Sequence, residues 1–403
     1  MSEDVVVIGG GPAGVAAAVE LRRRGVRRVV LLEREAALGG ATRHCLHSPF
    51  GMREFGRIYL GAAYGRRLTA EAERAGVDVR TGHAVVEIGE GGRLLVASAR
   101  GMEAVEARRV LLATGAREMP RSARLVPGDR PLGILTTGAL QAYVAFHGLM
   151  PFRRPLVVGS ELVSLSAVLT CLTHGARPVA LVEPGPRLLA RAPLALFPRL
   201  SGIKTHTATA IADIRGRGRV EAVDLRMADG TLRTLACDGV LFTGRFTPES
   251  SLLLGLPGGV DPRSGGPAID QDGRLQDPAR FAAGNVLRPV ETGGWAFREG
   301  RAVGAALALD LEHGPSPHAP VAVEFDDPVK LVVPGLIRPL AGALAHFQLR
   351  FARAARGRLS LSLEGRDVWE RRGRWMPERR ILVPIPPQVA EARSVRFAFE
   401  EES

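Results

Sequence analysis

The amino-acid sequence predicts an α/β protein in which one parallel-sheet domain is inserted into another and a small β-rich domain follows. Three observations lead to this prediction. Residues 4–33 read as a strand, a glycine-rich turn, a helix and a second strand, and residues 156–183 repeat that order. Residues 320–403 instead contain stretches of alternating hydrophobic and polar residues, at 358–365 and 394–401, with several prolines. Such alternation is typical of half-buried strands.

The first repeat carries a complete dinucleotide-binding fingerprint, in which Gly9, Gly11 and Gly14 follow a β-branched strand and precede a helix. Gly9 permits a tight turn, Gly11 lets the backbone approach a pyrophosphate, and Gly14 lets the helix pack closely on the strand. The helix N-terminus then binds the diphosphate, and Glu33 at the end of the second strand accepts hydrogen bonds from ribose hydroxyls. The predicted contacts of this Rossmann-like unit are Gly9, Gly11, Pro12, Ala13, Gly14 and Glu33.

The second repeat lacks two of the three glycines. Gly159 occupies the first position, but Glu161 and Ser164 occupy the second and third. A glutamate at the point of pyrophosphate contact adds bulk and like charge, which costs on the order of a few kcal/mol. We therefore expect this unit to serve as a scaffold, and NAD(P)H binding in another geometry is the alternative.

The segment 279–301 indicates which dinucleotide the first unit takes. It reads as a short strand ending in Gly284-Asn285, a loop, and a helix from about Trp295 through Leu309. This resembles the closing FAD motif of the two-dinucleotide-fold flavoproteins, the pyridine nucleotide-disulfide oxidoreductase group, with Asn285 in place of an acid. The stretches 110–118 and 239–248 resemble the two Thr-Gly junctions of the group, and the resemblance covers residues 4–312. It implies FAD as the cofactor, with further contacts from Gly40, Thr114, Gly115, Gly284, Asn285, Gly294 and Trp295.

The stretch GGATRHCLHSPFGMREF, residues 39–55, resembles flavoproteins that lack the redox disulfide of the group. These are the FAD subunits of opine oxidase and hydrogen cyanide synthase type amine dehydrogenases, and the flavoproteins associated with glycerol 3-phosphate dehydrogenases. The resemblance implies oxidation of a C–N or C–O bond next to a carboxylate or phosphate. His47 and His44 are the candidate bases, and Arg43 and Arg53 are the candidate anchors for an anionic small-molecule substrate.

Other interpretations of this stretch stay open. A histidine beside a flavin can simply donate a hydrogen bond to the ring or to a backbone carbonyl. Cys45 is the only local cysteine, so we expect neither a redox pair nor, with only His44 and His47 beside it, a four-ligand zinc site. No metal is predicted.

The composition excludes several classes of protein. The net charge of +12 comes from arginine, since lysine occurs only at Lys204 and Lys330, and no nucleic-acid module accompanies it. We expect no nucleic-acid partner. An acidic N-terminus and the absence of an apolar run of about 18 residues predict a cytoplasmic protein without a membrane span.

The predicted domains are a discontinuous FAD-binding domain, residues 1–118 and 245–313, a degraded NAD(P)-binding-like domain, 119–244, and the β-rich domain, 320–403. This last domain contains an arginine run near Trp369 and Trp375, which is either a solvated face or a docking surface for a partner subunit. The run comprises Arg371, Arg372, Arg374, Arg379 and Arg380.

The predicted function is that of an FAD-dependent dehydrogenase of a small amine, amino acid or hydroxy acid, which passes electrons to a partner protein or a quinone. Two alternatives remain. One is an NAD(P)H-dependent flavin reductase, and the other is a non-catalytic electron-transfer subunit of a larger dehydrogenase.

Overall fold

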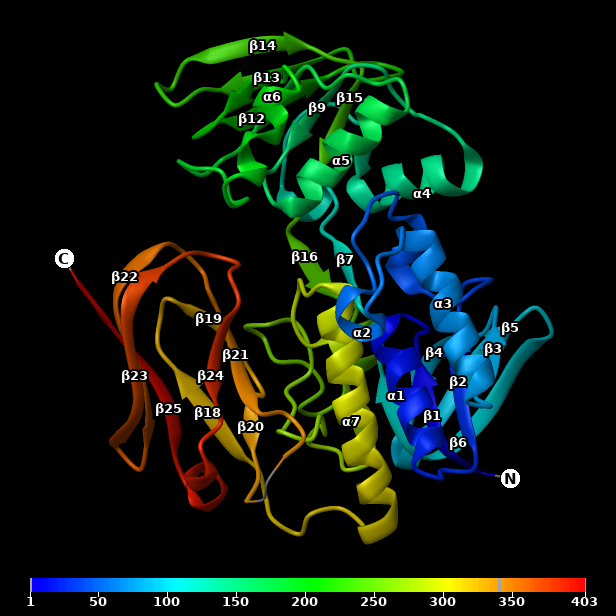
Figure 1. Cartoon of the computed structure of the whole chain (residues 1–403). Helices are drawn as coiled ribbons and strands as arrows, with labels where there is room; N and C mark the ends of the chain where they lie inside the picture. Colours follow the sequence, from blue (N-terminus) through cyan, green and yellow to red (C-terminus); the bar gives the residue numbers. More distant parts are fainter. Residues whose placement is uncertain (1, 340–341, 403) are drawn as a thin grey trace.

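The computed structural model describes residues 2–339 and 342–402 and contains two parallel sheets and a β-sandwich (Figure 1). The first sheet has the parallel order β3-β2-β1-β6-β17. The first half of β6 also pairs antiparallel with β5, and β5 pairs antiparallel with β4. Its strands are β1 (Glu3–Ile8), β2 (Val29–Glu33), β3 (Asp78–Thr81), β4 (Ala84–Ile88), β5 (Arg93–Ser98), β6 (Gly101–Leu112) and β17 (Arg280–Ala282).

Successive side chains of β1 point to opposite faces of the sheet, and both faces are covered by hydrophobic core. Val5 and Val7 pack against the three helices on one face, and Val6 and Ile8 pack on the other face. A strand buried on both faces reads as a continuous hydrophobic run, as this one does. The helices are α1 (Pro12–Arg23), α3 (Gly61–Arg74) and α7 (Gly293–His313).

The second parallel sheet has the order β11-β10-β9-β15-β8. Its strands and helices are β8 (Ile134–Thr136), α4 (Thr137–His147), β9 (Pro155–Val158), α5 (Leu162–Thr173), β10 (Ala180–Val182), α6 (Phe197–Leu200), β11 (Thr205–His206) and β15 (Gly239–Phe242). A three-stranded antiparallel meander packs on it, formed by β12 (Ala210–Arg215), β13 (Ala222–Arg226) and β14 (Leu232–Ala236). The chain enters and leaves this domain through β7 (Ala116–Glu118) and β16 (Phe246–Pro248), which pair antiparallel (Figure 1).

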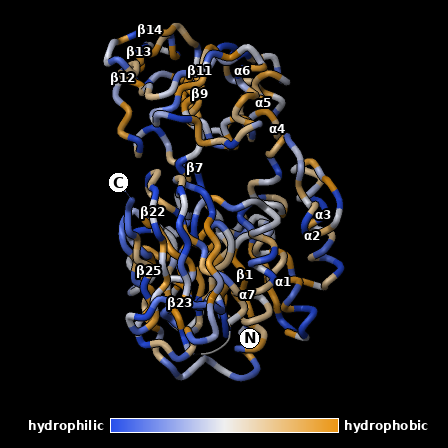
Figure 2. Tube along the Cα trace, turned by 60° about the vertical axis from the view of Figure 1, so that its left-hand side comes forward, coloured by the Kyte–Doolittle hydropathy of each residue, from blue (hydrophilic) through white to orange (hydrophobic). Residues whose placement is uncertain are grey.

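The C-terminal strands form two sheets around one hydrophobic core. One sheet has the order β20-β18-β25-β22-β23 and the other β19-β21-β24. Figures 1 and 2 show this sandwich beside α7 and the second parallel sheet beyond β7. The strands are β18 (Val321–Phe325), β19 (Val329–Val333), β20 (Leu336–Ile337), β21 (His346–Phe351), β22 (Ala355–Leu363), β23 (Arg366–Trp375), β24 (Ile381–Pro384) and β25 (Val395–Glu401).

The predicted fold class is therefore confirmed, with two Rossmann-like parallel sheets and further β-sheets. The helix predicted to begin at about Trp295 begins at Gly293 and continues to His313. Within the described residues, no helix combines the length and hydrophobicity needed to cross a bilayer.

Candidate functional site

The first glycine turn connects β1 to α1 and is shaped by close backbone contacts. A Cβ on Gly14 would lie 1.9 Å from the carbonyl oxygen of Gly9, and a Cβ on Gly9 would lie 2.6 Å from the carbonyl oxygen of Ala113. By contrast, a Cβ on Gly11 would meet no atom of the described residues within 4 Å. Helix α1 starts at Pro12 without a side-chain cap and without an acidic residue in its first turn. The turn thus offers open space and a free helix N-terminus, which fit the diphosphate of FAD.

Glu33 lies at the end of β2 and is buried. Its carboxylate accepts hydrogen bonds from the backbone N–H of Gly10 at 2.8 Å and of Glu35 at 2.9 Å. The residue therefore holds the glycine turn in place. A carboxylate has about four lone-pair positions, so two remain to accept bonds from a ribose.

Two distant glycines close around the first turn. Gly40 has a φ of +52°, and its Cβ position is 3.1 Å from the Cα of Gly11. Gly284 has a φ of +83°, and its Cβ position is 2.7 Å from the side chain of Ala13. The fold thus brings together four of the predicted cofactor contacts from three separate parts of the chain.

The predicted contacts Thr114 and Gly115 lie where the chain leaves the first sheet. The hydroxyl of Thr114 donates a hydrogen bond to the carbonyl of Glu249 at 2.6 Å, and the N–H of Glu249 donates to the carbonyl of Gly115 at 2.9 Å. These two residues therefore tie together the two strands that connect the domains.

Asn285 closes the loop that leads into α7. Its amide donates to the carbonyl of Glu291 at 3.2 Å and accepts from the N–H of Glu291 at 2.8 Å. The next predicted contacts, Gly294 and Trp295, lie in the first turn of α7, where a Cβ on Gly294 would be 2.8 Å from the Glu54 carboxylate. The side chain of Asn285 thus sets the position of the α7 N-terminus.

A buried ion cluster joins this loop to the C-terminal sandwich. The carboxylate of Glu291 pairs with Arg350 of β21 and, at 2.5 Å, with Arg380, which precedes β24. Burial lowers the pKa of Arg350, although Glu291 opposes this shift. The guanidinium of Arg380 also lies 3.9 Å from the centre of the Trp295 ring. Arg380 is therefore not part of a solvated face but a contact between the sandwich and α7.

Two further buried residues at this place escaped the sequence prediction. Glu299 of α7 accepts a hydrogen bond from the N–H of Gly284 at 2.8 Å and pairs with Arg288 at 2.6 Å. The Arg288 guanidinium also donates to Gln348 of β21 at 3.1 Å. The sequence carries a signal for their partners on β21, the stretch HFQLRF, in which Gln348 and Arg350 share one face of a strand. Such a face ordinarily points to solvent.

The predicted bases His44 and His47 follow the first domain's β2 but point to different neighbours. The ring of His47 lies 5.3 Å from Phe50, which in turn stacks on Tyr64 and lies 3.6 Å from the Cβ position of Gly293. The His44 ring instead lies 6.2 Å from Phe146 of α4, in the second domain. His47 is thus the histidine on the side of the α7 N-terminus.

Burial affects the titration of the whole segment. It lowers the pKa of His44, an effect that Arg43 strengthens and Glu35 opposes. It also lowers the pKa of His47, which a backbone hydrogen bond at Ser48 partly offsets. Both imidazoles are therefore neutral at neutral pH and able to accept a proton. Burial raises the pKa of the Cys45 thiol to about 11, so this thiol is not a nucleophile.

The two predicted anchors for an anion are separated. The guanidinium of Arg53 lies 5.4 Å from the Trp295 ring centre, close to the α7 N-terminus. The guanidinium of Arg43 lies 5.0 Å from the Phe146 ring centre and 3.9 Å from the carboxylate of Glu35. Arg53 therefore lies with His47 at one end of the segment, and Arg43 lies with His44 at the other.

The second glycine turn is occupied by the chain itself. The carboxylate of Glu161 accepts a hydrogen bond from Thr243 at 3.3 Å and lies 2.1 Å from the Cβ position of Gly244. Burial raises the pKa of this carboxyl group to about 7. The hydroxyl of Ser160 bonds to Glu183, and the N–H groups of residues 189 and 190 bond back to Ser160. A carboxylate and a loop thus lie where the first turn has open space.

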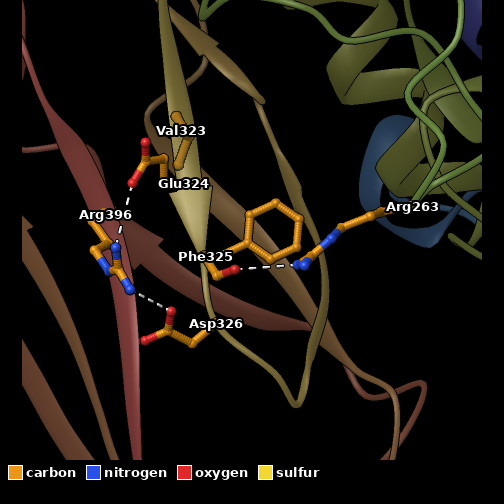
Figure 3. A pocket seen from close by; sticks show the side chains of 6 residues that line it. All are labelled: Arg263, Val323, Glu324, Phe325, Asp326 and Arg396. Carbon is orange, nitrogen blue, oxygen red and sulfur yellow. Dashed lines mark hydrogen bonds and ion pairs between the residues drawn. The ribbon is translucent and has the colours of Figure 1, made fainter.

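A cavity of about 390 Å³ lies between the first domain and the sandwich (Figure 3). Its arginines are bound by the chain itself, since Arg396 pairs with Glu324 and Asp326 and Arg263 donates to the backbone carbonyl of Phe325. The cavity shares no lining residue with the glycine turn or α7 and contributes nothing to the site.

The similarity of this chain to known proteins extends over the two Rossmann-like domains. The sequence profile of the family described as pyridine nucleotide-disulphide oxidoreductase matches residues 3–305. The HcnB protein of hydrogen cyanide synthase from Pseudomonas aeruginosa is 35% identical over 177 residues, which are 42% of this chain and 36% of that protein. One of the opine oxidase subunits of Agrobacterium tumefaciens is 33% identical over 166 residues, 39% of this chain and 32% of that protein. The chain thus spans about a third of the length of these relatives.

Among solved structures, thioredoxin reductase of T. acidophilum superposes with a TM-score of 0.64 at 21% identity, over 76% of this chain and 98% of that one. At this identity the likeness concerns the fold alone. The family resemblance predicted from residues 4–312, including the likeness to hydrogen cyanide synthase and opine oxidase subunits, is confirmed.

Proposed function

The chain belongs to the pyridine nucleotide-disulphide oxidoreductase family, a family of flavoprotein oxidoreductases, and from this premise we propose that it is an FAD-dependent dehydrogenase. Its substrate is a small amine, amino acid or hydroxy acid, and its electrons pass to a partner protein or a quinone rather than coming from NAD(P)H.

One observation carries this proposal, namely the contrast between the two glycine turns. The first turn has open space at Gly11, whereas the second turn holds the carboxylate of Glu161 and is covered by residues 189 and 190. Above neutral pH the Glu161 carboxylate is ionised and repels a pyrophosphate, and at any pH its side chain takes up space in the turn. This difference favours one dinucleotide per chain, bound at the first turn.

The residues at the α7 N-terminus supply the remaining chemistry. FAD, when bound, supplies the two-electron acceptor. His47, neutral at neutral pH, accepts the proton of the substrate amine or hydroxyl group. Arg53 binds the carboxylate or phosphate of the substrate, because no ion pair of its side chain occurs among the described residues.

Relatives named as subunits support a partner for this chain as well. We place the partner against the sandwich, where Arg371, Arg372 and Arg374 lie on the edge strand β23. Co-expression with candidate subunits, followed by size-exclusion chromatography, tests this point. A chain that elutes alone in every combination would contradict it.

Anaerobic titration of the FAD-loaded protein tests the reaction. The flavin absorption should bleach with at least one member of a panel of opines, proline, sarcosine and glycerol 3-phosphate, and it should remain when NADH or NADPH is mixed in. Bleaching by NADH within milliseconds would instead support an NAD(P)H-dependent flavin reductase. A flavin that no member of the panel reduces would support a non-catalytic electron-transfer role within a larger dehydrogenase.

A further inference from the structure

A second cavity, of about 480 Å³, lies against the outer edge of the second parallel sheet, where β11 is the last strand. Four cationic side chains line it, those of Arg154, Arg177, Lys204 and Arg233. Hydrophobic side chains of β10, β13 and β14 form the rest of the wall, and Ala180 and Leu225 among them are almost fully buried. The cavity is therefore amphipathic, with a hydrophobic floor and a cationic rim.

Sheet topology explains why three of the cations converge. Arg154 directly precedes β9, Lys204 directly precedes β11, and Arg177 lies three residues before β10. These strands are neighbours in the order β11-β10-β9 and run parallel, so their amino-terminal ends lie together at one end of the sheet. The glycine turn at Gly159 follows the other end of β9. The cations thus lie at the amino-terminal end of the sheet, whereas this fold binds dinucleotides at the carboxyl-terminal end.

The four cations of the cavity are exposed side chains, and the one carboxylate bound next to them, that of Asp238, accepts hydrogen bonds from the backbone N–H groups of Arg153 and Arg154 among the described residues. No carboxylate lines it, and within residues 2–339 and 342–402 none of the four cations makes an ion pair. In the described part of the chain, Arg177 alone among the four donates a side-chain hydrogen bond, from its guanidinium to the carbonyl of Ser201 at 3.1 Å. This differs from the cavity of Figure 3, where each arginine is satisfied by acceptors of the chain.

His206 also lines the cavity, beside two of these cations. Burial lowers the pKa of this histidine, and Arg233 and Lys204 lower it further. Like charges held together without counter-charge are unfavourable, and an anion that binds between them removes the repulsion.

We propose that this cavity binds a phosphorylated organic anion of the size of a nucleoside diphosphate, at a site separate from both glycine turns. Its phosphates lie against the four cations, since arginine forks and a lysine point charge are the side chains that bind phosphate. Its organic part covers the hydrophobic floor around Leu225. Four unpaired cations match two to four negative charges, and the volume lies in the range of small-molecule sites.

The test is calorimetric titration of the FAD-saturated protein with ADP, inorganic pyrophosphate and adenosine. Saturation with FAD keeps ADP away from the first glycine turn. ADP should bind, pyrophosphate should bind at least about tenfold more weakly because it leaves the floor uncovered, and adenosine should not bind. Two results would overturn the proposal. One is pyrophosphate binding as tight as that of ADP, and the other is a dissociation constant for ADP above about 1 mM, which is too weak for a specific site.

Variants assign the binding to this cavity. The double variant Lys204→Gln/Arg233→Gln and the single variant Arg154→Gln should each weaken ADP binding at least about tenfold. Arg226→Gln is the matched control, because Arg226 is exposed and lies between Leu225 and Met227 in sequence, on the other face of the meander. Without ligand, the double variant should melt no lower than the parent, since it loses repulsion rather than pairing. Equal ADP affinity in the parent and the double variant would refute the site.

Discussion

Replacement of Arg350 by methionine should destabilise the contact between the C-terminal sandwich and α7. The side chains of Arg350 and Glu291 are 1% and 3% exposed, so their pairing is shielded from water. Breaking a buried ion pair by removing one partner costs about 3–5 kcal/mol. Arg380 remains at 2.5 Å from Glu291 in the variant, so we expect the lower end of that range, about 3 kcal/mol.

Glu291→Gln should cost more, because it leaves the buried Arg350 charge and Arg380 without their carboxylate. The double variant should cost less than the sum of the two single variants, since the second replacement removes the charge that the first left unpaired. The measurement is guanidinium denaturation followed by tryptophan fluorescence. All three tryptophans lie in the sandwich or in the first turn of α7, so the signal reports on this part of the molecule.

Arg353→Met is the matched control, since Arg353 follows the same strand and binds Glu401 through two hydrogen bonds of 2.6 Å at an exposed site. Exposed pairs contribute little, so this variant should unfold as the parent does. If Arg350→Met were no more destabilising than Arg353→Met, the assignment of a buried and stabilising cluster would be wrong.

Three further predictions concern the two turns and the candidate base. Gly14→Val would place its Cβ 1.9 Å from the carbonyl oxygen of Gly9, so the purified variant should lack flavin absorption. A variant that stays yellow would contradict the assignment of the first turn. His47→Ala should retain FAD but slow substrate-driven flavin reduction by roughly 10²-fold in stopped-flow experiments. In the parent protein the reduction rate should be constant above neutral pH and fall in acid, because burial lowers the pKa of His47 below 6.5. Glu161→Gln should raise the melting temperature at pH 8 but not at pH 5: burial raises the folded-state pKa from 4.5 to about 7, so the folded protein binds this proton more tightly and loses stability as pH rises through that range. A shift of equal size at both pH values would show that Glu161 is ionised throughout.

Much of the fold could be predicted because its signals are local. A β-branched strand, three glycines at fixed spacing and a helix restrict the backbone within some 30 residues, and alternation does the same for the sandwich strands. The repeat at 156–183 was predictable for the same reason, and so was the loss of its second and third glycines. The limits of the domains and the contacts of the individual site residues stay predictions.

The sequence could not separate His47 from His44, which are three residues apart. The structure places one beside Phe50 and the other beside Phe146 of another domain. It also could not distinguish Arg380, which contacts Trp295, from the exposed arginines of the same run.

By itself, then, the sequence determined the two Rossmann-like units, the unequal state of their turns and the family to which the chain belongs. Tertiary structure alone decided that Arg350 and Arg380 meet Glu291 and that Arg154, Arg177 and Lys204 lie together at one end of a sheet. The physical reason is the distance along the chain over which each feature is determined. A turn is fixed by the φ angles and sterics of adjacent residues, whereas the environment of a charged side chain depends on which distant surface covers it, and burial determines both its partner and its ionisation.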